Sequence, residues 1–141
     1  MISQELMLGD WVQFTSEQWL TEEDACPLKV TCVGEPKYPD FYPYIRIEGR
    51  NENYHIDLFQ PIPLTQEILE KNGFTKGGMF GKTYYLAVED FEISVYFAHV
   101  NTQLIIEKRN GREIINMLNV EYLHILQHAL RLCGIEKQIE L

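Results

Sequence analysis

Two histidines near the end of the chain have a spacing that metal sites use. His124 and His128 are four residues apart, which on a helix puts two imidazole rings on adjacent turns, where they can share a zinc ion. No glutamate follows His124, and no third ligand lies nearby along the chain. The surrounding apolar pattern also puts both rings on the polar face of the predicted helix. We therefore predict no metal site here.

A second arrangement suggests structural zinc. Cys26 and Cys32 lie in the same half of the chain as His55, but zinc modules pair close ligands two to four residues apart and need four of them. Cys32 follows the alternation of a predicted strand, so we interpret it as a small core residue. With Cys133 the cysteines number 3. An odd number without a signal peptide predicts reduced thiols.

Carboxylates and glycines are plentiful without forming a recognisable active site. The acidic residues gather in two short runs, Glu22-Glu23-Asp24 and Glu89-Asp90-Glu92. General acid–base catalysis needs two carboxylates that face one cleft, and neighbours on a turn do not specify that. The glycines between residues 77 and 81 lack the helix start that a phosphate-binding loop requires. We predict no catalytic residue and no cofactor.

Basic residues cluster at one predicted hairpin tip. Lys108, Arg109 and Arg112 flank Asn110-Gly111, a pair typical of a two-residue type I′ turn. Such a tip could contact an acidic partner. Charges at hairpin ends also keep tips soluble and edges unpaired, and this is the interpretation we favour.

An aromatic segment is the strongest candidate for recognition. Four rings, at Tyr38, Phe41, Tyr42 and Tyr44, are interspersed with two prolines in residues 38–44. The prolines exclude a helix and a central strand, so the segment is predicted as a loop. Rings and prolines can form a groove for an extended peptide. Alternatively, they seal one module against the other. We assign these four residues as candidate partner-binding residues.

Charge and hydropathy exclude several classes of protein. Of the 141 residues 45% are hydrophobic and 23% are charged, as in an ordinary globular domain. No apolar run reaches the roughly 18 residues that cross a bilayer, and the first residues lack a signal peptide, so we expect a cytoplasmic protein with no membrane partner. Residues 1–60 hold 4 Lys/Arg and 11 Asp/Glu, and residues 61–141 hold 8 and 10. This balance disfavours nucleic-acid binding.

The N-terminal half alternates short strands with turns. Residues 8–14, 28–33, 44–47 and 54–58 read as strands, with a polar helix predicted over 16–24. We interpret residues 1–60 as a small SH3-like β-barrel or an open, curled sheet. Such a barrel is marginally stable alone, so we expect it to pack on the second module.

The C-terminal half, residues 61–141, is predicted as an α-ββββ-α module. A stiff connector (61–63) leads to a helix (65–71) with Thr65 as N-cap and Asn72-Gly73 as C-cap. Four antiparallel strands follow between 84 and 117. A helix over 121–133 has an apolar stripe to cover them, formed by Tyr122, Ile125, Leu126, Ala129, Leu130 and Cys133. The fold class is therefore α+β.

Three phrases of the sequence carry a resemblance: residues 8–12 (LGDWV), 60–74 (QPIPLTQEILEKNGF) and 120–127 (VEYLHILQ). Together they resemble a family of short uncharacterised proteins from gut anaerobe genomes and their prophages or mobile elements. The shared phrases are a strand start, a capped helix and an amphipathic helix, so the resemblance implies fold and order of elements, with no activity, cofactor or site residue.

These observations favour a non-enzymatic protein-interaction module with an unidentified protein partner. The alternatives are a small enzyme whose polar residues cannot be paired from sequence, and an acidic DNA mimic that occupies a nucleic-acid-binding protein.

Overall fold

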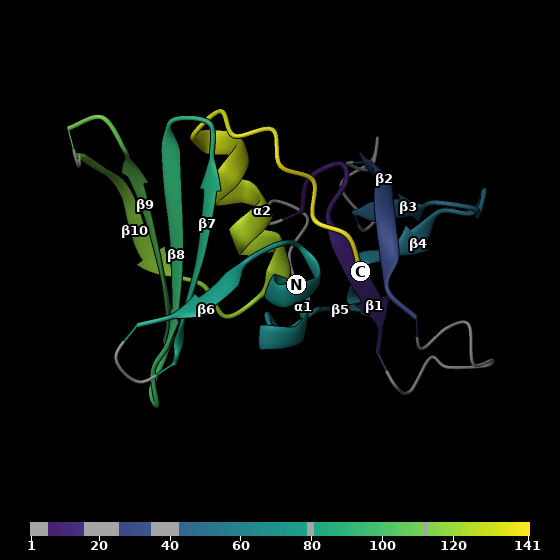
Figure 1. Ribbon diagram of the computed structural model, residues 1–141. Coiled ribbons are helices and arrows are strands. Elements are labelled where there is room, and N and C mark those ends of the chain that lie inside the picture. Colours follow the sequence, from purple (N-terminus) through teal and green to yellow (C-terminus); the bar gives the residue numbers. More distant parts are fainter. Residues whose placement is uncertain (1–5, 16–25, 35–42, 79–80, 112) are drawn as a thin grey trace. The chain divides into compact units, whose positions relative to one another are not determined.

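The computed structural model describes residues 6–15, 26–34, 43–78, 81–111 and 113–141. The chain divides into two compact units, Met1–Ile62 and Pro63–Leu141. Each unit is built on an antiparallel sheet (Figure 1), so the predicted α+β class is confirmed. That the two units pack as one body stays a prediction, and the predicted helix over 16–24 lies outside the described residues.

The N-terminal unit contains one five-stranded sheet with the order β4-β3-β2-β1-β5. Its strands are β1 (Trp11–Phe14), β2 (Leu28–Gly34), β3 (Tyr44–Ile47), β4 (Tyr54–His55) and β5 (Phe59–Pro61). The sheet is open, because β4 and β5 lie at opposite edges of it. The hydrogen-bonded strands therefore form an open sheet, one of the two forms expected, and the SH3-like barrel stays a prediction.

The strand predicted over 54–58 ends early. It stops at His55 and continues as η4, a 3-10 helix over Ile56–Leu58, because the His55 Nδ1 atom accepts a hydrogen bond from the Asp57 N–H at 3.1 Å. The chain then forms β5, which the sequence did not reveal. Pro61 ends β5 opposite Val12, and an edge strand tolerates proline because its missing N–H breaks no central ladder.

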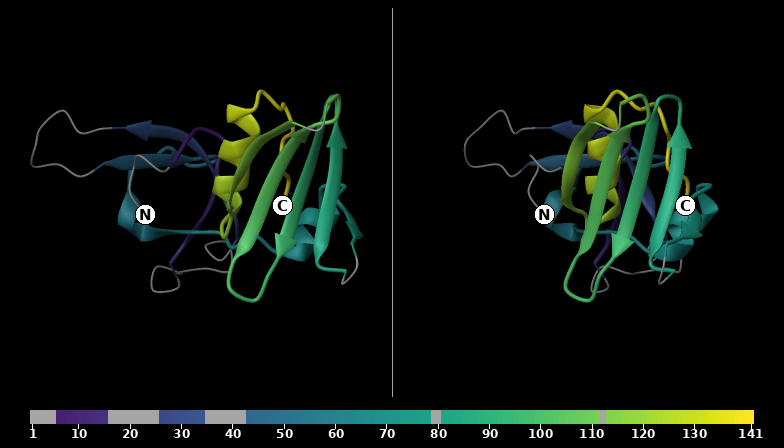
Figure 2. Two further views of the ribbon diagram at one scale, coloured as in Figure 1. Left: turned by 90° about the vertical axis from the view of Figure 1, so that its left-hand side faces the viewer. Right: turned by 60° about the vertical axis from the view of Figure 1, so that its left-hand side comes forward.

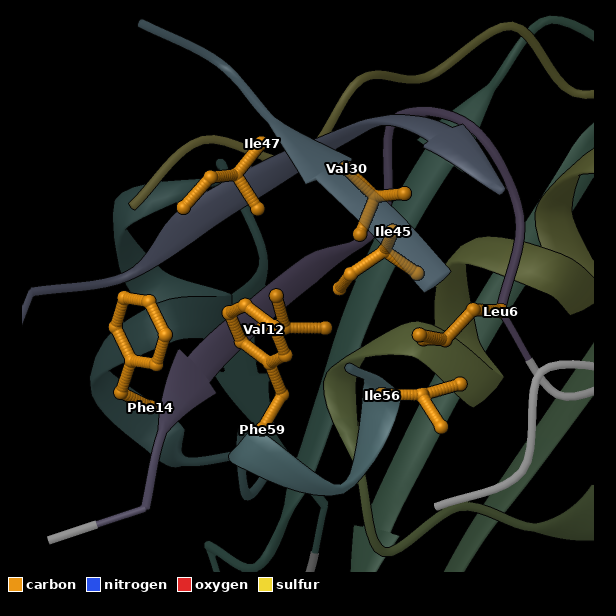
Figure 3. Packing of buried hydrophobic residues seen from close by; sticks show 8 residues of the cluster. All are labelled: Leu6, Val12, Phe14, Val30, Ile45, Ile47, Ile56 and Phe59. Carbon is orange, nitrogen blue, oxygen red and sulfur yellow. The ribbon is translucent and has the colours of Figure 1, made fainter. Parts of the chain in front are cut away.

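The core of this unit lies on one face of its sheet (Figure 3). Eight buried side chains form it: Leu6, Val12, Phe14, Val30, Ile45, Ile47, Ile56 and Phe59. Burying each such side chain contributes about 1.5 to 3 kcal/mol. Val12 and Phe14 confirm the predicted register of β1, but Leu8 is 62% exposed because the turn at Gly9 (φ +84°) separates it from the strand.

The C-terminal unit also has five strands, in the meander order β10-β9-β8-β7-β6. They are β6 (Thr75–Gly77), β7 (Thr83–Val88), β8 (Phe91–Phe97), β9 (Thr102–Lys108) and β10 (Glu113–Asn119). Four of them were predicted, and the short edge strand β6 was missed because three residues carry no periodic pattern. Tyr84, Ile93, Val95, Leu104 and Ile106 are fully buried on one face. The alternation of apolar residues along their strands predicted this for Tyr84, Ile93 and Val95.

Both predicted turns of the meander exist, with backbone geometry that differs from expectation. Glu89 has a φ of +52° and is the one described non-glycine residue with positive φ. Between β9 and β10, Gly111 has a φ of +104°, whereas the φ of Asn110 is not positive. A type I′ turn needs positive φ at both central residues, so the position of this turn was predicted correctly and its type was wrong.

Both helices of this unit end as their sequences dictate. In α1 (Gln66–Lys71) the Thr65 hydroxyl caps the Ile68 N–H at 3.3 Å, which confirms the predicted N-cap. Gly73 has a φ of +86°, and the Phe74 N–H donates to the Leu69 carbonyl at 3.0 Å, the pattern of a Schellman C-cap. Helix α2 (Leu123–Leu132) ends with the same C-cap pattern, in which Gly134 and Ile135 take the places of Gly73 and Phe74.

Helix α2 covers the inner face of the sheet (Figures 1 and 2), and Leu126, Ala129 and Leu130 of its predicted apolar stripe are buried, but the rest of its predicted faces were wrong. Leu123 is fully buried and Ile125 is half-buried, so the apolar stripe is turned from its expected position. His124 and Gln127, assigned to the polar face, are only 6% and 7% exposed. No described helix has the length and apolarity needed to span a membrane.

The segment after α2 is fixed by one buried amide. The Asn72 side chain donates from Nδ2 to the Glu140 carbonyl and accepts from the Glu140 N–H, each at 2.8 Å. The same amide nitrogen also donates to the Ile68 carbonyl. Asn72 therefore joins the end of α1 to the C-terminal segment, in which Ile135 and Ile139 are buried.

A buried hydroxyl joins α1 to the sheet. Tyr84 on β7 is 0% exposed, and its Oη lies 3.2 Å from both Gln66 Oε1 and Glu70 Oε1 on α1. Burial, then the hydrogen bond and negative charge of Glu70, raise the pKa of Tyr84 above its ordinary value of 10.0. The hydroxyl therefore remains protonated while exposed tyrosines ionise.

We expect Asn72→Ala to destabilise the protein by about 1 to 3 kcal/mol, because the variant leaves the Glu140 N–H and carbonyl without their shared partner. Urea unfolding measures the change. Asn119→Ala, at an exposed position on β10, is the control and should leave the unfolding midpoint unchanged. Equal midpoints for the two variants would show that Asn72 contributes nothing.

We also expect Tyr84→Phe to lower stability in a pH-dependent way. Since folding raises the pKa of Tyr84, the hydroxyl contributes fully below its unfolded pKa, and that contribution is lost as pH rises through the folded pKa. The stability difference between wild type and Tyr84→Phe should therefore be larger at about pH 8 than at about pH 11. Urea midpoints at both pH values measure it. A constant difference would contradict this origin, and Tyr96→Phe provides a partly exposed control.

Candidate functional site

Of the four predicted partner-binding residues, the structure describes one. Tyr38, Phe41 and Tyr42 lie in residues 35–42, outside the described part of the chain. Tyr44 begins β3, directly after that segment, and is half-buried. The candidate site is therefore built outward from Tyr44.

Strand register places Tyr44 on the face opposite the core. Its neighbour Ile45 is fully buried, and side chains alternate along a strand, so Tyr44 points to the outer face. It lies between Gly34 on β2 and His55 on β4 in the two adjoining ladders. These three residues form a row across the outer face, which we name the Tyr44 row.

The Tyr44 ring lies across Gly34 rather than projecting from the sheet. A Cβ atom built on Gly34 would overlap the outer half of that ring, including Cζ and the hydroxyl. Only a glycine at position 34 leaves the ring this space, since every other residue adds a Cβ. A ring that covers a strand glycine is held flat against the backbone. The phenol is therefore held in place before any partner binds.

His55 brings a polar ring to the other end of the row. Its Nδ1 atom accepts from the Asp57 N–H at 3.1 Å and lies 3.4 Å from Asp57 Oδ2. His55 has 33% of its side chain exposed. The row thus combines a flat phenol with an imidazole that is oriented by its contacts at the start of η4.

An aromatic cluster beneath the sheet supports this arrangement. The Phe14 and Phe59 rings stack at 4.5 Å, and Tyr54 meets Phe14 edge-on at 5.5 Å. Tyr54 precedes His55 on β4 and pairs with Ile45, the neighbour of Tyr44. Because rings packed in this way resist movement, the strands that carry the Tyr44 row are firmly positioned.

The zinc interpretation of Cys26 and Cys32 gains no support. No group of three or more His, Cys, Asp or Glu side chains suited to a metal ion occurs among the described residues. Cys32 was expected in the core, yet it is half-buried. A register shift between Val30 and Cys32 pairs Cys32 with the exposed Arg46, and this moves the thiol out of the core.

The histidine pair on α2 is close but differently placed from the prediction. The His124 and His128 rings lie 5.6 Å apart, edge to face, and Tyr122 stacks on His124 at 6.0 Å. His124 is buried, so the expectation that both rings face solvent was wrong. The contact with Tyr122, at the start of the helix, helps to explain the enclosure of that ring.

The charged residues considered in the sequence analysis are not brought together into a site among the described residues. Lys108 and Arg109 are exposed at the hairpin tip, as predicted, and Arg112 lies outside the described residues. Glu89 and Asp90 occupy an exposed turn, while Glu92 lies on the outer face of β8. The acidic run 22–24 lies outside the described residues, as does part of the glycine segment 77–81.

One surface was missed by sequence reasoning, which followed only the inward residues of the meander. Tyr85 and Tyr96 lie on its outer face, and a Cβ on Gly77 would come within 2.9 Å of Tyr85 Cε2. Tyr85 therefore lies along Gly77 much as Tyr44 lies along Gly34. The signal was available in the sequence, since the residues between the inward positions include these rings.

Comparison with known proteins adds no assignment: no family model, no curated protein and no solved structure matches this chain.

Proposed function

We propose that this protein is a non-enzymatic interaction module that binds a protein partner through the outer face of its N-terminal unit. The observation that carries the proposal is the Tyr44 ring, held flat across Gly34. A fixed aromatic surface binds with little loss of side-chain entropy, and tyrosine adds a hydroxyl for hydrogen bonding. Tyr38, Phe41 and Tyr42 stay predicted partner-binding residues on sequence grounds alone, since they lie outside the described residues.

An SH3-like unit is the finer fold that we infer for residues 1–62. The strand order β4-β3-β2-β1-β5 supports it, as does the 3-10 helix between β4 and β5. In this interpretation the short β5 returns beside β1, and the segments 16–25 and 35–42 connect neighbouring strands of one curled sheet. Aromatic rings beside such connections suit an extended, proline-rich peptide.

The polar neighbours of Tyr44 fit recognition better than catalysis. His55 is oriented by a backbone N–H and by Asp57, and its partner in the strand register is the Tyr44 ring. A peptide would meet an aromatic plane beside an imidazole, which together contribute apolar area and hydrogen bonding.

The test distinguishes three contributions to binding: the Tyr44 ring, its hydroxyl, and the glycine over which the ring lies. Wild type, Tyr44→Ala, Tyr44→Phe and Gly34→Ala are used as baits in the cytosol of the source organism, and captured proteins are quantified by mass spectrometry. We expect one partner that wild type and Tyr44→Phe retain. Tyr44→Ala removes the ring and Gly34→Ala displaces it, so both should lose that partner. Leu132→Ala, at an exposed apolar position of the other unit, is the matched control and should retain it.

Gly34→Ala also has a predicted cost in stability. The added methyl occupies the place of the Tyr44 ring, whose far end must swing away, and such overpacking costs about 1 kcal/mol or more. Urea unfolding of the four baits checks that each is folded. If no captured protein depends on the Tyr44 ring while the variants remain folded, the proposed function is wrong.

A further inference from the structure

The meander in the C-terminal unit has one face that its own helices leave uncovered. Helix α2 lies behind the strands in Figure 2, and Tyr84 meets α1 on that same side. The strand register assigns a common set of residues to the opposite side, which we name the outer face: Thr83, Tyr85, Ala87, Glu92, Ser94, Tyr96, Gln103, Ile105, Glu107 and Ile114. Ile114 is 54% exposed and Tyr96 is 38% exposed.

The middle of the outer face combines aromatic and aliphatic side chains with small polar ones. Tyr85, Ser94 and Ile105 lie directly across from one another on β7, β8 and β9. Tyr96 occupies the next outer row on one side, and Ile114 lies beside Glu107 on the other. Exposed aromatic and aliphatic side chains that gather on one face are typical of interaction surfaces.

Two carboxylates give the outer face a negative charge. Glu92 on β8 is directly opposite Glu107 on β9, and like charges at such positions repel and destabilise a sheet. Among the described residues neither carboxylate has an ion-pair partner. Side chains directly opposite one another are about 5 Å apart at Cβ, so one guanidinium or ammonium group can contact both carboxylates. The repulsion is then replaced by attraction.

The same pair of carboxylates excludes two other occupants. A second copy placed face to face offers no cation to this pair, because the strand register puts no described Lys or Arg on the outer face, and carboxylates left unpaired in a partly desolvated interface cost free energy. A single-stranded nucleic acid could stack bases on Tyr85 and Tyr96, but its phosphates would be repelled by Glu92 and Glu107, and by a chain of net charge −9. A cationic protein segment remains.

We propose that the outer face docks a protein segment that places Arg or Lys over Glu92 and Glu107 and apolar side chains over Ile105, Tyr85 and Tyr96. Two residues along a strand span about 7 Å, so the apolar groups of the partner lie about 7 to 13 Å from its cationic group. This surface is distinct in residues and in unit from the Tyr44 row. The protein then offers two separate interaction surfaces.

If Glu92 and Glu107 serve docking and not folding, removing one of these charges should raise the stability of the protein. Glu107→Gln removes the like-charge repulsion while keeping size and hydrogen-bonding capacity, so the variant should have a higher urea midpoint than wild type. A residue pair retained only for folding would show the reverse, since its removal would destabilise the fold. Glu92→Gln is the equivalent change on β8, and the double variant should unfold normally and cooperatively.

The test uses NMR titration of the full chain labelled with nitrogen-15. The probe is the blocked peptide acetyl-Trp-Leu-Gly-Arg-Arg-amide, and the matched probe has Glu in place of both Arg residues. A short polyuridine is the third ligand. We expect only the arginine probe to shift the amide signals of β7, β8 and β9. In the Glu92→Gln and Glu107→Gln double variant its affinity should fall about fivefold or more.

A second double variant controls for overall charge. Glu121→Gln with Glu136→Gln removes two exposed carboxylates of the same unit and should retain the affinity of wild type. Failure of the arginine probe to shift the outer face, or an equal loss of affinity in both double variants, would overturn the proposal. Binding of polyuridine or of the glutamate probe at this face would overturn it as well. None of these results depends on Tyr44, so they leave the proposed function of the N-terminal unit to its own test.

Discussion

Both sheets depend on one constraint, the strict alternation of side chains along paired strands. Burying Ile45 and Ile47 in one unit, and Ile93 and Val95 in the other, fixes one face of each sheet. Every residue between these positions must then point to the opposite face. Tyr44 and the Glu92–Glu107 pair reach their positions in this way, so the candidate surfaces follow from the packing of the cores.

Glycine decides how tyrosine uses these outer positions. Gly34 leaves room for the Tyr44 ring, and Gly77 leaves room for Tyr85. A glycine within a strand weakens it, because it loses more entropy on folding and has no side chain to pack. A ring laid over the neighbouring glycine restores packed surface there. The same contact holds the ring in one orientation, so an element that supports the sheet also prepares a binding surface.

The C-terminal unit is held together by polar contacts that local patterns do not reveal. Asn72 follows α1 in the sequence, yet its amide pairs with the backbone of Glu140. Tyr84 is an inward strand residue whose hydroxyl reaches α1. Buried polar groups of this kind must be satisfied. Both contacts place the first helix and the last segment of this unit, so they complete the layer that covers the inner face and leave the outer face open.

Much of the local structure could be read from the sequence. The N-cap at Thr65, the C-caps at Gly73 and Gly134, the alternation in β7 to β9 and the turn at Gly9 each depend on residues close together in the chain. Their energies are local, so the pattern determines them. Several of the errors share a cause: the register shift at Cys32, the short strand β5 and the rotated face of α2 depend on partners that lie far away in sequence. The short strand β6 pairs with its neighbour β7 and was missed because three residues carry no periodic pattern.

The candidate sites divide along the same line. The sequence by itself determined that tyrosines are abundant, that the N-terminal half is acidic and that no recognised catalytic or metal pattern is present. Only the tertiary structure decided that Tyr44 lies across Gly34, that Glu92 faces Glu107, and that His124 is buried. Strand pairing and helix packing join residues through space, and the spacing of residues along one chain does not encode which of them become neighbours across a sheet.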